Sequence, residues 1–236
     1  MIVNLFSGPR NISTALMYSF AQRPDTKVID EPLYGYYLKQ TGADHPGREE
    51  VLGQMDTDPI KILTNMIQFD KEQSLIFIKN MCHHFIDLPV TFLLPLKNIF
   101  LIRDPVDMLP SLCVQIPNPT LRDTALKHQW TLFTQLEELG QRPLIIDART
   151  LLNDPVRILK HLCLSLNIPF FDSMLAWDKG PRPEDGIWAK YWYQKVHDST
   201  GFSPYEEKQE PFPSYLIEVL NECKPYYKSL LQYAVD

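Results

Sequence analysis

The chain has 236 residues, of which 44% are hydrophobic, and this size suits one globular domain spanning residues 1–236. Its 23 basic and 29 acidic side chains give a net charge of −6, which disfavours nucleic acid and anionic membranes as partners. Four cysteines without paired spacing disfavour a zinc site or a disulfide framework, so we expect no metal and a reducing compartment. No apolar run approaches ~20 residues and no signal peptide is visible, so we expect a cytoplasmic protein.

The predicted elements alternate between short apolar runs and amphipathic helices. Strands are predicted at residues 2–6, 27–29, 75–78, 98–102 and 143–146. Helices are predicted at residues 12–22, 59–69 and 120–140, after the Asp154-Pro155 pair, and from about residue 213. Residues 40–58 are polar and read as an irregular loop. Apolar strands without polar alternation, separated by helices, predict an α/β fold with a parallel sheet of about five strands covered on both faces.

Charged residues stand at the ends of several predicted strands. They are Glu31, Lys79, Arg103 and Asp147. In open parallel sheets, ligands bind beyond the carboxyl ends of the strands, so these charges are candidates for a ligand site. The alternative is that each charge only marks the point where its strand leaves the core.

The turn after the first strand is typical of a phosphate-binding loop. Residues 7–11 join a strand to a helix that begins near Ser13 and Thr14, and the N–H groups of a helix start favour an anion. Arg10 adds a cationic fork inside the turn. The loop lacks the second glycine and the lysine of a Walker A motif, which disfavours a Mg-ATP hydrolysis site. The alternative is a plain turn in which Asn11 or Ser13 caps the helix.

Residues 7–14 read S-G-P-R-N-I-S-T and resemble the 5′-phosphosulfate loop of sulfotransferases that use PAPS (3′-phosphoadenosine 5′-phosphosulfate). Bacterial members of that family often read P-R-S-G-T-T. Pro and Arg match at positions 9 and 10, and Ser and Thr match at 13 and 14, while Ile12 replaces the glycine. The resemblance implies that the donor is bound by Gly8, Pro9, Arg10, Asn11, Ile12, Ser13 and Thr14.

Later segments extend the resemblance to about residue 180. A strand ending at Arg103, with Ser111 eight positions further along the chain, resembles the family's 3′-phosphate motif. The alternative for Arg103 is a surface pair with Asp104 or Asp107. Residues 144–155 resemble a scaffold segment of the family, and Lys179 with Gly180 resembles its loop over the nucleotide.

The resemblance implies a P-loop NTPase-like, three-layer fold and a metal-independent sulfuryl transfer from PAPS to a hydroxyl or amine. Arg10 would stabilise the leaving oxygen, and Arg103 and Ser111 would recognise the 3′-phosphate. The general base is Glu31 or one of the histidines after the third strand, His83 or its neighbour, and we favour Glu31. Lys79 either steadies the sulfuryl group or pairs with Glu31. The family's histidine position is occupied here by Met81.

The acceptor is a small molecule or a glycan in this interpretation, and the oligomeric state stays open. Residues 181–236 form an aromatic-rich C-terminal extension with a final helix. Its aromatic residues and one just before it suit a sugar or an aromatic alcohol, and equally a capped core or a protein interface: Trp177, Trp188, Tyr191, Trp192 and Tyr193. Two alternatives to a sulfotransferase are a small-molecule kinase and a binding module that keeps the fold without catalysis.

Overall fold

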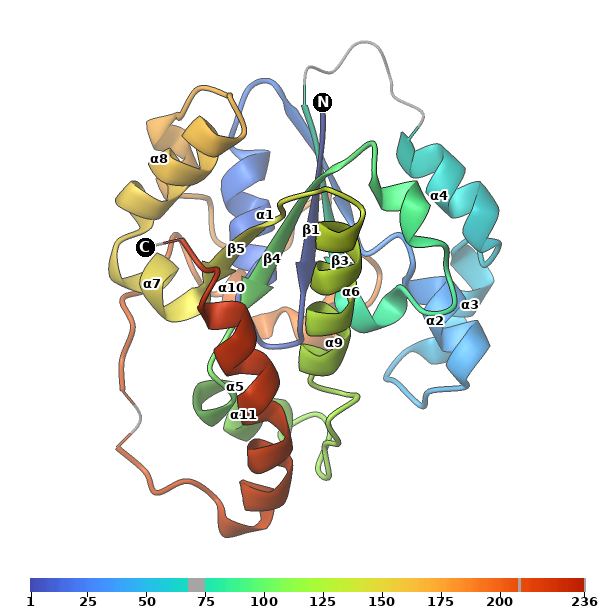
Figure 1. Cartoon of the computed structure of the whole chain (residues 1–236), viewed down its shortest axis with the longest axis vertical. Helices are drawn as coiled ribbons and strands as arrows, with labels where there is room; N and C mark the ends of the chain where they lie inside the picture. Colours follow the sequence, from blue (N-terminus) through green and yellow to red (C-terminus); the bar gives the residue numbers. More distant parts are fainter. Residues whose placement is uncertain (68–74, 208, 236) are drawn as a thin grey trace.

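The computed structural model describes residues 1–67, 75–207 and 209–235. Its centre is a sheet of five parallel strands in the order β2-β3-β1-β4-β5 (Figure 1). The strands are β1 (Ile2–Ser7), β2 (Thr26–Asp30), β3 (Leu75–Met81), β4 (Lys97–Ile102) and β5 (Leu144–Asp147). The predicted α/β class and the parallel sheet are therefore confirmed.

The strand order places a switch point at the carboxyl end of β1. From β1 the chain crosses to β2 and β3 on one side, whereas β4 pairs with the other edge of β1 and leads away to β5. The loops that follow β1 and β4 therefore diverge, and ligands of open α/β sheets bind at such a point. These two loops carry Arg10 and Arg103.

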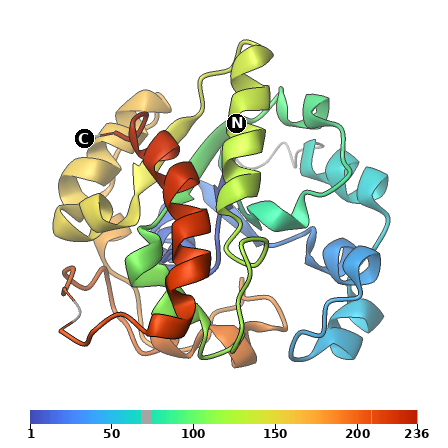
Figure 2. The same ribbon diagram turned by 60° about the horizontal axis from the view of Figure 1, so that its bottom comes forward.

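Helices cover both faces of the sheet because every residue of β1 and β3 is buried and neither face can meet water. One face packs against α6 (Leu126–Glu138) and α11 (Ile217–Leu231), which lie side by side (Figure 2). The other face packs against α1 (Ser13–Ala21) and α8 (Pro155–Ser165). Asp154 caps α8 and Pro155 opens it, as predicted.

The other described helices have nine residues or fewer. They are α2 (Tyr34–Thr41), α3 (Arg48–Gln54), α4 (Pro59–Ile67), α5 (Pro105–Leu112), α7 (Ala148–Asn153), α9 (Ala189–Trp192) and α10 (Gln194–His197). Single 3₁₀ turns form at η1 (Cys82–His84), η2 (Val90–Leu93), η3 (Asp172–Leu175) and η4 (Ser214–Leu216). Among the helices of the described ranges, none is long and apolar enough to cross a membrane.

Two sequence predictions about helices were wrong. The helix predicted at 120–140 begins only at Leu126, because Ala125 before it has a left-handed backbone with φ of 62°. The polar segment 40–58 is not wholly irregular, since it contains α3, which buries Val51. Residues 68 and 69 of the helix predicted at 59–69 lie outside the described residues, and α4 is described to Ile67.

Besides the hydrophobic cores on the two faces of the sheet, a smaller, aromatic core lies beside the strand ends. It joins α2, α3 and the segment around α9 through the buried side chains of Tyr34, Tyr37, Leu38, Val51, Trp188, Ala189 and Tyr193. Part of the aromatic cluster of the C-terminal extension is thus a capped core, as one of the alternatives held. Trp177 packs in the core of the α1 face instead, and Tyr191 is exposed.

Gly8 lies where the packing of the loop after β1 leaves no room for a side chain. A Cβ atom added there would lie 2.6 Å from the carbonyl oxygen of Thr124, which is backbone and has little freedom to move. We expect Gly8→Ala to lower the free energy of unfolding by about 1–3 kcal/mol in urea denaturation. The matched control is Gly53→Ala in α3, where a Cβ meets nothing within 4 Å. That change should raise stability by up to about 1 kcal/mol, and equal effects of the two would contradict the placement of the loop.

Candidate active site

A pocket of about 400 Å³ opens at the carboxyl ends of the strands. The loop after β1, from Pro9 to Thr14, forms one part of its wall, together with Arg103 and Ser111. Glu31 and Lys79 lie at another part, beneath the aromatic side chains of α2 and α9. Most of the predicted site residues thus line one pocket.

The loop after β1 is held in an unusual backbone shape. Arg10 and Ile12 both have φ of 60°, in the left-handed region that favours glycine. Ile12 precedes α1 with no side-chain cap, and the Asn11 side chain donates to the carbonyl of Leu101 at 3.2 Å. The expectation that Asn11 or Ser13 caps the helix is therefore wrong. Positive φ at a β-branched residue costs on the order of 1–3 kcal/mol, a pattern found at functional sites.

Two arginines and a serine that the sequence motifs singled out meet in this pocket. The Nε of Arg10 donates to the Oγ of Ser111 at 2.9 Å, and Arg103 donates from Nη1 to the Arg10 carbonyl at 2.7 Å. Burial, and then the charge of Arg103, lower the pKa of Arg10. Burial also lowers the pKa of Arg103, although Asp107 opposes this. Two half-buried like charges side by side favour an anionic ligand that offsets them.

The carboxylates around Arg103 have other partners. Asp104 accepts from the backbone N–H of Val106 at 2.9 Å and caps α5. Asp107 accepts from Arg149 at 3.1 Å. The Arg103 guanidinium directs one donor to the Arg10 carbonyl in the loop after β1, and the charge of Asp107 also acts on it.

Lys79 lies in a fully buried ionic cluster. Its Nζ is 2.9 Å from Asp30 Oδ1 and 2.5 Å from Glu31 Oε1, and its side chain has no exposed area. Burial raises the pKa of Glu31; the charge of Lys79 opposes this rise and that of Asp30 adds to it. Burial lowers the pKa of Lys79, but the two carboxylates outweigh it and the pKa is raised overall. Lys79 is thus charged, and Glu31 is the group of the cluster that is easier to protonate than an ordinary glutamate.

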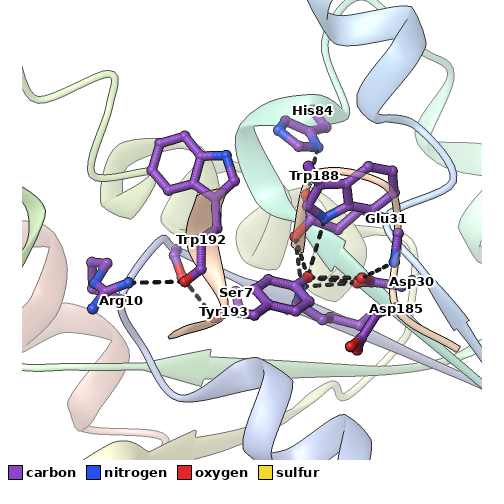
Figure 3. A network of polar contacts seen from close by, with 12 residues as sticks. Ser7, Arg10, Asp30, Glu31, His84, Asp185, Trp188, Trp192 and Tyr193 are labelled. Carbon is purple, nitrogen blue, oxygen red and sulfur yellow. Dashed lines mark hydrogen bonds and ion pairs between the residues drawn. The ribbon is translucent and has the colours of Figure 1, made fainter. Parts of the chain in front are cut away.

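Tyr193 completes this cluster and was not assigned a role from the sequence. Its hydroxyl accepts from Lys79 and from Trp188 Nε1, the latter at 3.2 Å, and donates to Asp30 Oδ2 at 2.8 Å (Figure 3). Burial, followed by the charges of Asp30 and Glu31, raises the pKa of Tyr193 well above its ordinary value. Lys79 and Tyr193 are 114 residues apart, so no local spacing could reveal the contact.

The two histidines after β3 are buried. His83 is 6% exposed and His84 is 1% exposed. Burial lowers the pKa of His83 to about 3 and that of His84 well below its usual value, so both rings are neutral near pH 7. A base with so low a pKa accepts a proton poorly at neutral pH. The structure therefore favours Glu31 over His83, and it is His84 that faces Glu31, with 3.8 Å between Nδ1 and Oε2.

Lys179 and Gly180 do not join the other predicted residues. Lys179 pairs with Asp198 at 3.3 Å with its side chain 64% exposed, and Gly180 donates its N–H to the His197 carbonyl at 2.8 Å. Neither is among the described residues that line the pocket, and Gly8 supports the loop from behind without lining it. The pocket is instead lined by Ser199 and by residues 201–206, which the sequence motifs did not indicate.

A five-stranded parallel sheet covered by helices, with a pocket at the carboxyl ends of its strands, defines the chain as an α/β protein. The particular family follows from the sequence as a whole, because residues 1–234 match the family of sulfotransferase domains. The chain belongs to that family.

Two plant proteins are 39% identical to the chain over 230 residues. They are the branched-chain-amino-acid aminotransferase-like proteins 2 and 1 of Arabidopsis thaliana, and the match covers 97% of this chain and 41% of each relative. The chain therefore spans about two fifths of the length of these relatives.

Solved sulfotransferase structures share the fold at low identity. The sulfotransferase domain of the Synechococcus PCC 7002 olefin synthase gives a TM-score of 0.57 at 16% identity, covering 94% of this chain and 93% of that one. A sulfotransferase from Alicyclobacillus acidocaldarius gives 0.55 at 13% identity, covering 98% and 96%. These likenesses confirm the sulfotransferase-like fold.

The raised pKa of Glu31 predicts a pH dependence of stability. The folded protein holds the Glu31 proton more tightly than the unfolded chain, whose glutamate pKa is about 4.3. Stability is therefore lost as pH rises from that value through the raised folded pKa. We expect Glu31→Gln to gain stability relative to the wild type as pH increases from about 4 to about 8, measured by urea denaturation. The exposed Glu138→Gln should follow the wild-type profile, and parallel curves for Glu31→Gln would refute the prediction.

Proposed function

We propose that this protein transfers a sulfuryl group from PAPS to the hydroxyl of a small-molecule or glycan acceptor. The observation that carries the proposal is the convergence of Arg10, Arg103 and Ser111 in one pocket at the switch point of the sheet. PAPS differs from ADP by its 3′-phosphate and its sulfuryl group, so a second cationic group beside the phosphate loop suits it. Membership of the sulfotransferase family supports PAPS as the donor.

The transfer is an in-line displacement at sulfur. The acceptor oxygen forms a bond to sulfur while the bond between sulfur and the 5′-phosphate oxygen breaks, and that oxygen keeps the electron pair. Arg10 and the N–H groups at the start of α1 would stabilise the charge that develops on the leaving oxygen. Arg103 and Ser111 would hold the 3′-phosphate of the product, adenosine 3′,5′-bisphosphate.

Glu31 is the proposed general base for the acceptor. Its raised pKa brings it closer to neutrality, where a base combines availability with proton affinity. The adjacent Lys79 ammonium, 2.5 Å from Oε1, would steady the sulfuryl oxygens and keep Glu31 from remaining protonated. Tyr193 and Asp30 hold this lysine in place.

A binding module without catalysis is the second candidate function. One observation favours it: Lys79 is fully buried and already engaged by Asp30, Glu31 and Tyr193. Such a protein would bind PAPS and its product without consuming the donor. A kinase is less compatible, because the loop after β1 carries Arg10 and no lysine.

The donor site predicts a selective stabilisation by adenosine 3′,5′-bisphosphate. At about 100 times its dissociation constant a ligand adds ~2.7 kcal/mol to the folded state, which raises the melting temperature measurably. We expect the bisphosphate to raise the melting temperature more than ADP or AMP does, and Arg103→Ala to abolish the difference. Arg157→Ala on α8 removes an exposed charge outside the pocket and should leave the response intact.

An equal response to ADP and to the bisphosphate would contradict recognition of the 3′-phosphate. A bisphosphate response without any release of product from PAPS, over a broad panel of alcohols, would favour the binding module.

A further inference from the structure

The two carboxylate oxygens of Glu31 have different surroundings. Oε1 lies 2.5 Å from Lys79 Nζ and 3.3 Å from the hydroxyl of Tyr193. Oε2 faces His84 Nδ1 across 3.8 Å. Hydrogen bonds from nitrogen to oxygen span about 2.7–3.2 Å, so these two atoms point toward each other without bonding. In Figure 3, His84 lies above the cluster that contains Glu31 and Tyr193, and Arg10 lies away to the left.

His84 presents an unpaired polar atom at a fixed position. Its side chain is 2% exposed, and Nδ1 has no hydrogen-bond partner within the described part of the chain. The ring stacks on Tyr37 at 4.5 Å between centroids and on Tyr34 at 4.9 Å. An unpaired buried polar group costs about 1–3 kcal/mol, and here the stacked rings keep it aimed at Glu31.

An oxygen atom placed to one side of the line between these two atoms lies within hydrogen-bond distance of both. Points about 2.8 Å from both atoms exist, because their separation of 3.8 Å is less than twice that length. Glu31 and His84 both line the pocket that also contains Arg10 and Arg103. We propose that this position is the binding site for the acceptor hydroxyl, which donates to Glu31 Oε2 and accepts from His84 Nδ1. The inference rests on the proposed sulfuryl transfer and names the subsite in which the acceptor reacts.

The contacts of the acceptor hydroxyl with Glu31 and with His84 have different roles in the sulfuryl transfer. The acceptor proton moves to Glu31 Oε2 as the acceptor oxygen bonds to sulfur, and the bond from sulfur to the 5′-phosphate oxygen breaks. The Nδ1–H of neutral His84 occupies one lone pair of the acceptor oxygen and leaves the other for sulfur. His84 is therefore a binding and orienting residue, and Glu31 takes the proton.

The side chains that line this subsite determine which kind of alcohol can bind there. Four aromatic side chains line this part of the pocket: Tyr34, Tyr37, Trp188 and Trp192. Tyr34 and Trp188 meet edge to face, at 5.1 Å and 78°. Flat aromatic faces bind flat apolar rings. The cation beside them, Lys79, is engaged by two carboxylates, so the subsite suits an uncharged alcohol carried on a ring.

Two substitutions separate the hydrogen bond of His84 from its ring. His84→Phe keeps a stacked ring and removes the N–H, while His84→Asn restores an N–H donor close to the position of Nδ1. The probes are phenol, toluene, which has the same ring with a methyl group in place of the hydroxyl, and glycerol, which has hydroxyls without a ring. Binding is measured by calorimetry on protein saturated with adenosine 3′,5′-bisphosphate, so that the donor site is filled.

We expect phenol to bind the wild type more tightly than toluene or glycerol. His84→Phe should weaken phenol binding about tenfold, which corresponds to ~1.4 kcal/mol, and leave toluene binding unchanged. His84→Asn should recover phenol binding to within about threefold of the wild type. With PAPS as donor, His84→Phe should raise KM for phenol and lower kcat, whereas binding of the bisphosphate stays as in the wild type.

Equal phenol binding by the wild type and His84→Phe would overturn the proposal, as would phenol binding no tighter than toluene. Glycerol binding as tight as phenol would overturn the ring preference. Failure to bind adenosine 3′,5′-bisphosphate at all would instead overturn the proposed function, and the acceptor subsite with it.

Discussion

The buried ammonium of Lys79 joins the parts of the molecule that make the pocket. It links Asp30 at the end of β2, Glu31 just beyond it, and Tyr193 in the segment that covers the strand ends. A lysine without exposed area is tolerated only where carboxylates balance its charge, and two are present here. The position of the covering segment, and therefore the shape of the pocket, depends on this balance.

Much of the fold follows from local sequence, because strands of a covered parallel sheet read as uninterrupted apolar runs. All five strands were predicted from such runs, and α8 from its Asp-Pro start. Helix α3 escaped prediction because its residues are mostly polar and it buries only Val51. The start of α6 was predicted too early because Ala125 has a left-handed backbone, and alanine as a residue type does not predict that conformation.

In the candidate site, too, the residues in local motifs were predicted and those that depend on distant contacts were not. Arg10, Arg103 and Ser111 were predicted to meet because each lies in a short motif beside a strand end, and the structure brings them together. Tyr193 and the pairing of Glu31 with His84 depend on contacts between distant segments and on which way a side chain points. Aromatic and histidine residues also occur in an ordinary core, so their presence alone did not distinguish a role in packing from a role in a binding site. Ile12 has the left-handed backbone that glycine favours, at the position where the family's motif often has glycine.

The long sequence interval between Lys79 and Tyr193 affects the order in which parts of the protein fold during synthesis on the ribosome. Strands β1 to β5 are synthesised before residue 193, so the sheet can form while Lys79 and its carboxylates still face water. Contacts over such intervals form slowly because a long loop must close first. The Lys79 cluster is therefore enclosed only after all five strands have been made, and a chain truncated before Tyr193 would leave this cluster open to water.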